Sequence, residues 1–300
     1  MEMEGILEAW NAHYGAQLPL TSELLEATFF TLPPTDRFII QNNDFCLFIK
    51  KESTQLRLHL AVPLKTSSIK HICKQAIDAL DEKALELEIK KITFGGGDKH
   101  LFPGVPLLSE QKPWLEYFSP TGEVVMDFQG SIEELIEQVN LKHQADQSLR
   151  SVQQSPGILR QTQNKAEEKE LLSFVEAEFK GRWAREIIED AQNNKLQHYF
   201  AYFIKDKIVG YARLYGWNTD YWAPGVYFAT PMKGTCGLGP IGVASFARGE
   251  GYGSEILKAS WEILKSKGCE TVRIDWTTEL NFYERAGLHV VQKYQPAVRC

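Results

Sequence analysis

The chain has 300 residues and a formal net charge of −6, and 43% of its residues are hydrophobic. This length exceeds the usual size of one domain, and the apolar content can fill ordinary cores, so two domains are expected. The acidic balance argues against nucleic acid or an anionic membrane surface as the main partner and favours a small molecule.

The N-terminal sequence Met-Glu-Met-Glu-Gly lacks the basic and apolar regions of a signal peptide, and no apolar run is long enough for a membrane span. These features predict a cytoplasmic protein. The five cysteines never stand in a CxxC spacing, and the seven histidines form no HxxxH or HExxH pair. We therefore expect reduced thiols rather than a disulfide framework, and no metal site.

The first half of the chain predicts a mixed α/β arrangement without a strong catalytic motif. Strand composition marks residues 37–50, 55–62 and 92–94, helical spacing of apolar residues marks 67–87, and a second helix is expected from 131. The turn sequence Ser119-Pro120-Thr121-Gly122 predicts a hairpin.

Between residues 141 and 170 the sequence turns polar and rich in glutamine, with few large apolar side chains. We place the domain boundary in this stretch. The expected organisation is a first domain over residues 1–145, a polar linker over 146–165 and a second domain over 166–300.

The second half predicts two helices, a hairpin, and then a strand that leads through a glycine-rich loop into another helix. The expected ranges are 168–179 and 182–191 for the helices, 198–204 and 208–214 for the hairpin, 238–243 for the strand and 254–264 for the last helix. A further strand is expected at 271–276.

The glycine-rich loop, Arg248-Gly249-Glu250-Gly251-Tyr252-Gly253, stands directly before the last of these helices. Backbone N–H groups at a helix N-terminus have no intrahelical acceptor and carry the positive end of the helix dipole. Glycines let a pyrophosphate approach these groups, and Arg248 adds a cation. The alternative is that the glycines merely turn the chain. A Rossmann dinucleotide site would need G-x-G-x-x-G, which this loop does not fit.

Two segments carry a family resemblance. Residues 241–253 resemble motif A of the GNAT acetyltransferase superfamily, in which an apolar strand ending in Val leads to R/Q-x-x-G-x-G/A. Residues 281–288, Asn-Phe-Tyr-Glu-Arg-Ala-Gly-Leu, resemble the FYEKxGF segment of the same superfamily. Many relatives have Asn and Ala where this chain has Trp276 and Glu279, so the overlay of residues 275–281 is imprecise.

The resemblance implies a mixed α/β (α+β) fold that binds acetyl-CoA and transfers its acetyl group directly to a primary amine. The coenzyme-binding residues that it implies are Ile241, Val243, Ala244, Arg248, Gly249, Gly251, Tyr252, Gly253 and Ser254. A main-chain N–H near Val243 or Ala244 would polarise the thioester carbonyl.

Two side chains are candidates for the proton transfers. Tyr283 holds the superfamily's position for the acid that protonates the leaving thiolate, and the alternative is a tyrosine that packs in the core. Asp275, at the end of an apolar strand, is the first candidate for the base that takes the proton of the amine, and a surface aspartate is the alternative. Asp220 and Glu176 are weaker candidates, for which solvated surface positions are favoured.

Aromatic residues gather between the predicted hairpin and the coenzyme strand. Trp217, Tyr221, Trp222 and Tyr227 supply rings that would stack well on sugar rings and nucleobases. The expected acceptor-binding residues are Trp217, Asp220, Tyr221 and Trp222. Ordinary packing of a long loop is the alternative. Trp183, in the preceding helical region, either closes the same pocket or belongs to the core.

Through its segments 94–97, 101–106, 239–243 and 274–277 the chain is similar to tandem-domain GNAT proteins of Gram-positive bacteria, some of which resemble glucosaminide N-acetyltransferases. This resemblance implies two twisted mixed sheets flanked by helices, and a degenerate N-terminal domain without an R-x-x-G-x-G loop. The favoured function is acetylation of a small amine, best an amino sugar, by a monomer or homodimer. A peptide or protein N-acetyltransferase and a non-catalytic acyl-CoA-binding sensor are the alternatives.

Overall fold

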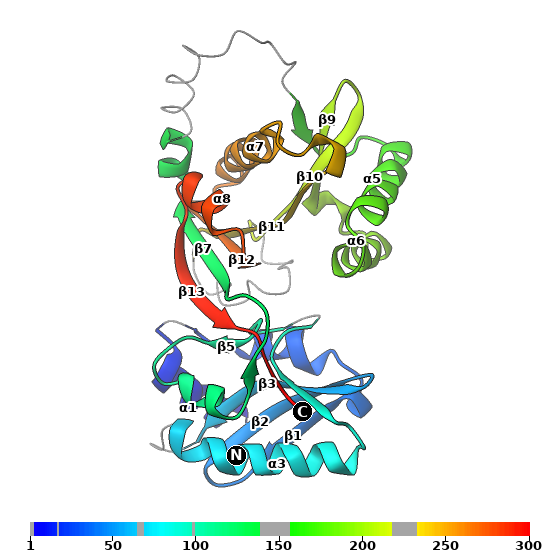
Figure 1. The fold of residues 1–300 in the computed structure, drawn as a ribbon. Coiled ribbons are helices and arrows are strands. Elements are labelled where there is room, and N and C mark those ends of the chain that lie inside the picture. The colour runs from blue at the N-terminus through cyan, green and yellow to red at the C-terminus, as the bar shows by residue number, and fades with distance from the viewer. Residues whose placement is uncertain (1–2, 17, 65–68, 98–99, 139–156, 218–232) are drawn as a thin grey trace.

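The computed structural model describes residues 3–16, 18–64, 69–97, 100–138, 157–217 and 233–300. Within these ranges the chain forms two mixed α/β lobes, each built on one sheet with helices packed against it (Figure 1). No helix in the described ranges is long and apolar enough to cross a membrane.

The first lobe is built on a six-stranded sheet of order β1-β2-β3-β4-β14-β6. β3 and β4 run parallel, and the other neighbours run antiparallel. Its elements are α1 (Met3–Tyr14), β1 (Arg37–Gln41), β2 (Phe45–Glu52), β3 (Gln55–Pro63), α3 (Ile69–Glu86), β4 (Lys91–Phe94), β6 (Ser119–Pro120) and β14 (Ala297–Arg299). The predicted helix at 67–87 is confirmed as α3, because its apolar residues recur on one buried face.

The second lobe is built on an eight-stranded sheet of order β5-β13-β7-β12-β11-β10-β9-β8. β11 and β12 are parallel, and the helix α7 connects them. Its strands are β5 (Val105–Pro106), β7 (Val125–Ser131), β8 (Ile158–Arg160), β9 (Tyr199–Ile204), β10 (Lys207–Tyr215), β11 (Thr235–Val243), β12 (Thr271–Thr277) and β13 (His289–Gln295). Its helices are α5 (Lys165–Glu178), α6 (Arg182–Gln192), α7 (Tyr252–Ser266) and α8 (Leu280–Arg285). The predicted hairpin β9–β10 and the predicted succession of strand, glycine loop and helix are confirmed.

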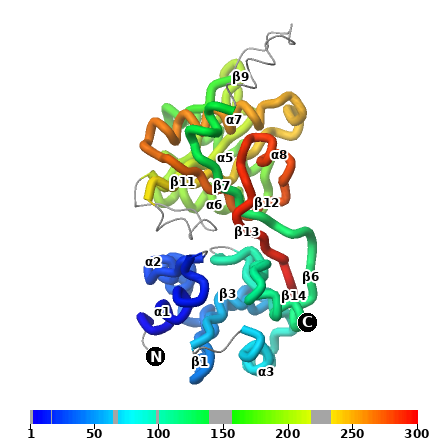
Figure 2. The backbone as a smooth tube through the Cα atoms, turned by 90° about the vertical axis from the view of Figure 1, so that its left-hand side faces the viewer, coloured from blue at the N-terminus to red at the C-terminus, as the bar shows by residue number. Residues whose placement is uncertain are grey.

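The two lobes exchange strands where they meet. β7, from the first half of the sequence, lies between β12 and β13 in the second sheet, whereas β14 lies between β4 and β6 in the first. Figure 2 shows the C-terminal segment leaving the second lobe through β13 and ending beside β6. The predicted hairpin through residues 119–122 is therefore wrong, because β6 and β7 find their partners in different sheets. Residues 146–156 of the predicted linker lie outside the described residues, and the domain boundary stays a prediction.

Cys236 and Cys269 are joined by a disulfide, with their Cα atoms 6.0 Å apart. The expectation of reduced thiols is wrong for this pair. The parallel strands β11 and β12 start side by side, so the crossover through α7 brings together two cysteines that are 33 positions apart in the sequence. Cys46 and Cys73 are buried and free, and Cys300 is exposed and free.

Removal of residues 297–300 tests how much stability the strand exchange provides. Without β14, both β4 and β6 lose a neighbour, and the Arg299 guanidinium no longer holds the Asp81 carboxylate 2.7 Å away on α3. A buried peptide group left unpaired costs about 1–3 kcal/mol, so we expect the free energy of unfolding in urea to fall by at least about 2 kcal/mol. Removal of the exposed Cys300 alone is the control. Equal unfolding midpoints for the two truncations would contradict this account.

Candidate functional site

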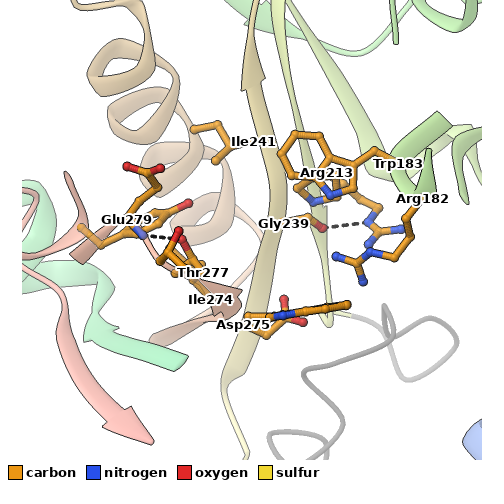
Figure 3. Close-up of a pocket in the computed structure, with 13 residues that line it drawn as sticks. Arg182, Trp183, Arg213, Gly239, Ile241, Ile274, Asp275, Thr277 and Glu279 are labelled. Carbon is orange, nitrogen blue, oxygen red and sulfur yellow. Dashed lines mark hydrogen bonds between the residues drawn. The ribbon is translucent and has the colours of Figure 1, made fainter. Parts of the chain in front are cut away.

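A cavity opens where β11 and β12 separate. The register between these strands joins residues 235–237 to residues 271–273, and both strands continue beyond it. Past the paired part lies a cavity of about 270 Å³, with residues of α6 on one side of β11 and residues 277–279 on the other (Figure 3). It is lined by Arg182, Trp183, Arg213, Gly239, Pro240, Ile241, Ile274, Asp275, Trp276, Thr277, Thr278, Glu279 and Tyr283.

Asp275 extends from β12 into this gap. A Cβ built on Gly239 would lie 3.6 Å from Asp275 Oδ1, so the carboxyl stands directly beside β11. Burial raises the pKa of Asp275 to about 6; the guanidinium groups of Arg182 and Arg213 oppose this rise, and the carboxylate of Glu186 adds to it. At neutral pH the carboxyl is therefore mostly ionised, with a pKa close enough to neutrality for a general base.

Tyr283 lines the same cavity from α8. Its side chain is 5% exposed, and its ring centroid lies 5.3 Å from that of Phe128 and 5.0 Å from that of Phe282. Burial, together with the charges of Asp275 and Glu279, raises the pKa of Tyr283 well above its ordinary value, so the phenol stays protonated at neutral pH. The residue thus packs in the core and also faces the cavity.

The alternation of backbone N–H groups along β11 shows which of them face the gap. The Ala244 N–H donates to the Val209 carbonyl, with N and O 2.8 Å apart. In an antiparallel pair, successive N–H groups point alternately toward and away from the partner strand, so Gly242 also faces β10. The N–H groups of Ile241 and Val243 therefore point toward the side of β12. Of the two residues predicted to donate to the thioester, Val243 has the suitable orientation.

The glycine-rich loop follows β11 and begins α7. Gly251 is the N-cap of α7, with φ of 87° and no side-chain cap hydrogen bond, and Gly249 has the same φ. A Cβ on either glycine would meet nothing within 4 Å, so the loop surface is open. Arg248 Nε donates to the Val243 carbonyl, 3.2 Å away, which holds the side chain next to the strand end. An open, uncapped helix N-terminus beside a cation fits a pyrophosphate.

The loop and the two cavity residues lie within a segment that matches a known family. The model of the Acetyltransferase (GNAT) family matches residues 165–288, which include Arg248, Asp275 and Tyr283. Residues 165–288 are a GNAT domain. No curated protein matches the chain.

Solved structures extend the likeness of the GNAT domain to the whole chain. The GCN5-related glucosamine N-acetyltransferase region of a fungal multi-domain GH3 β-N-acetylglucosaminidase is similar over 98% of this chain, with 16% identity and a TM-score of 0.75; this chain spans 36% of that protein. A tandem GNAT protein from the clavulanic acid biosynthesis pathway is similar over 99% of this chain and 95% of its own, with 11% identity and a TM-score of 0.59. A GCN5-related N-acetyltransferase from Sphaerobacter thermophilus is similar over 98% of this chain and 91% of its own, with 12% identity and a TM-score of 0.63. The chain therefore has a tandem GNAT fold.

The predicted aromatic acceptor site is only partly described. Trp217 packs against His198, with ring centroids 5.2 Å apart, and is not among the residues that line the cavity. Asp220, Tyr221 and Trp222 lie outside the described residues. The acceptor role of this group stays a prediction.

Other lining residues of the GNAT domain come from its helices and from β10. Trp183 lines the cavity and also packs on Phe179, with ring centroids 5.4 Å apart, whereas Glu176 is exposed on α5 and away from the lining. Neither Arg182 nor Arg213 is among the site residues predicted from the sequence. Arg213 is the one charged residue in the apolar run 208–214, and a charge in a buried strand needs partners, so its position carries a detectable signal. Arg182 stands at the start of an amphipathic helix, where an arginine is ordinary, so the sequence gives no signal for its role.

Substitution of Arg182 tests the electrostatics of the GNAT-domain cavity. We expect Arg182→Gln to raise the pKa of Asp275 above its value of about 6, because Arg182 is the first of the two cations that stabilise the ionised carboxylate. A carbon-13 NMR titration of the side-chain carboxyl carbons measures this pKa. Arg185→Gln, an exposed position on the same helix, is the control and should leave the pKa unchanged. An unchanged or lowered pKa in Arg182→Gln would show that the cation does not act on Asp275.

Proposed function

We propose that the protein transfers the acetyl group of acetyl-CoA to the primary amine of a small molecule, and that an amino sugar is the first candidate acceptor. The observation that carries this proposal is the meeting of Asp275 and Tyr283 in one cavity, between strands that separate just before an open glycine loop. Membership of the GNAT family supports acetyl transfer in general.

Acetyl-CoA, when bound, supplies the acetyl group as an activated thioester. The loop residues Arg248, Gly249 and Gly251 fit its pyrophosphate, because the glycines leave the N-terminus of α7 open and the arginine adds a positive charge. The Val243 N–H faces the gap and would donate to the thioester oxygen as negative charge develops there. One donor of this kind contributes about 2.7–4 kcal/mol in other oxyanion sites.

The two titratable residues of the cavity divide the proton transfers between them. Asp275 is ionised at neutral pH and would take the proton of the acceptor ammonium, leaving a free amine to attack the thioester carbon. Tyr283 keeps its phenol proton at neutral pH and would give it to the thiolate as the carbon–sulfur bond breaks. The raised pKa values of the base and the acid both follow from burial.

The shape and lining of the cavity support a small, sugar-like acceptor over a peptide. A volume of about 270 Å³ lies just below the usual range for small-molecule sites, which begins at about 300 Å³. Trp183 and Trp276 line the cavity with aromatic rings, and Thr277 and Glu279 line it with polar groups, which is the combination that suits a sugar ring. The similar fungal protein region is named for glucosamine N-acetylation, which adds support for this acceptor class.

Substitution in the glycine loop tests the coenzyme site. Gly251→Ala should raise the Kd for acetyl-CoA by about fivefold or more, because an L side chain strains the left-handed backbone at φ 87° by about 1 kcal/mol and moves the loop. Isothermal titration measures the Kd. Gly268→Ala is the matched control: this glycine also has positive φ (81°) and open space for a Cβ, but it follows the other end of α7. Equal affinities for the two variants would argue against the loop as the pyrophosphate site.

Acetyl-CoA turnover, measured as release of free thiol, tests the activity and the acceptor class together. The panel contains glucosamine, glucosaminide disaccharides, polyamines, amino acids and short peptides, and we expect release with the amino sugars. Tyr283→Phe should lower kcat by about 10²-fold, in the range for loss of a general acid, without changing acetyl-CoA affinity. Tyr117→Phe, in the first lobe, is the control. Tight coenzyme binding without release for any amine would replace this proposal with a non-catalytic acyl-CoA-binding function.

A further inference from the structure

A buried carboxyl group on the exchanged strand β7 lies behind the cavity. Asp127 is 5% exposed and makes two hydrogen bonds through its side chain. Its Oδ1 accepts from the backbone N–H of Trp276, 3.1 Å away, and its Oδ2 accepts from the hydroxyl of Tyr294 on β13, 2.8 Å away. The carboxyl thus joins β7 to both neighbouring strands.

The hydrogen bond to Trp276 holds an irregular piece of backbone. Phe128 is paired with Ile274, and Met126 with Thr277, so the single residue Asp127 faces both Asp275 and Trp276. This is a β-bulge, in which an extra residue bends the strand and changes the direction of its side chains. Trp276 adopts a left-handed backbone with φ of 46°, which a bulky residue rarely takes unless its surroundings hold it there.

The two residues of the bulge are the ones that β12 directs into the cavity. Asp275 and Trp276 both line the cavity. The Trp276 ring lies between elements of both lobes: the Arg182 guanidinium carbon is 4.3 Å from its centroid, and the ring of His100, from the first lobe, is 4.4 Å away in an edge contact. Because successive strand residues face opposite sides, loss of the bulge would turn one of the two side chains away from the cavity.

We propose that Asp127 is a positioning residue of the acetyl-transfer site, which fixes the bulge of β12 and thereby directs the Asp275 carboxyl and the Trp276 ring into the cavity. This inference rests on the proposed function for its effect on turnover. β7, the exchanged strand from the first half of the chain, thus supports the part of the cavity wall that Asp275 and Trp276 form, although no residue of β7 lines the cavity.

The electrostatic interaction between Asp127 and Asp275 shows which substitution of Asp127 preserves its positioning role. Burial and the nearby charge of Asp275 raise the pKa of Asp127 to about 7. A neutral side chain with the same shape is therefore acceptable at this position. Asparagine retains an oxygen that accepts from the Trp276 N–H and an amide that can pair with Tyr294, whereas leucine keeps the approximate shape and accepts nothing.

The test compares Asp127→Leu with Asp127→Asn in the full chain by two measurements. In Asp127→Leu we expect kcat for acetyl transfer to fall by about tenfold or more with the KM for acetyl-CoA unchanged, because a small displacement of catalytic groups is costly to the rate. Hydrogen exchange of the Trp276 amide should become about tenfold faster or more, since its acceptor is gone. In Asp127→Asn both quantities should stay within about threefold of the wild type. Unfolding in urea confirms that each variant is folded.

The two measurements separate this inference from the proposed function. A folded Asp127→Leu variant with wild-type kcat or with wild-type exchange at Trp276 overturns the positioning role. If the wild-type protein acetylates no amine, the proposed function fails, and the exchange result alone then decides whether Asp127 holds the bulge. Should Asp127→Leu not fold, Asp127→Ala takes its place with the same expected results, because its methyl group cannot accept a hydrogen bond from the Trp276 N–H.

Discussion

The second lobe depends on the separation of β11 from β12 after a short paired stretch. Peptide groups beyond Gly237 and Arg273 cannot bond across the gap, and buried peptide groups need partners. Every second peptide group of β11 pairs with β10, and β12 pairs in the same way with β7, whereas the alternate groups of β11, such as the Val243 N–H, face the gap. Each edge of the gap is therefore held from its outer side. The cavity can exist between two strands of one sheet because neither strand relies on the other for its hydrogen bonds at that depth.

A buried ion cluster fixes the helical wall of the cavity. Arg213 is 3% exposed; its Nε donates to the Gly239 carbonyl at 2.8 Å, and its Nη2 lies 3.2 Å from Glu186 Oε2 on α6. The Tyr199 hydroxyl donates to Asp190, which also belongs to α6 and lies 3.6 Å from the Arg213 guanidinium. Removal of one member of such a cluster leaves an uncompensated buried charge and costs about 3–5 kcal/mol. The cluster ties α6 to β9, β10 and β11, and so holds the start of α6 at the cavity.

Local features of the fold are predictable from the sequence, and long-range pairings are not. The glycine loop, α7 and the hairpin β9–β10 each follow from residues that are close in sequence. The turn at 119–122 is visible in the same way, but turn residues show that a chain bends and not which strand it then joins. The Cys236–Cys269 pair arises from a crossover, so spacing rules for nearby cysteines cannot detect it. Asp127 lies in an apolar run, where a single charged residue indicates burial with partners but does not identify Trp276 and Tyr294 as those partners.

The first lobe has a structural part in the site, although its sequence lacks an R-x-x-G-x-G loop. The first half of the sequence provides β7, which lies between β12 and β13 in the second sheet. The C-terminal strand β14, in turn, lies between β4 and β6 in the first sheet. Neither sheet is complete without a strand from the other half of the chain, so the two lobes are coupled in stability. Contact also runs through side chains, because His100 of the first lobe lies against the Trp276 ring in the cavity wall. Burial lowers the pKa of His100 to about 3, so this contact is made by a neutral ring that adds shape and not charge. The first lobe thus contributes to the shape of the cavity wall at Trp276, while the groups suited to proton transfer come from the other lobe.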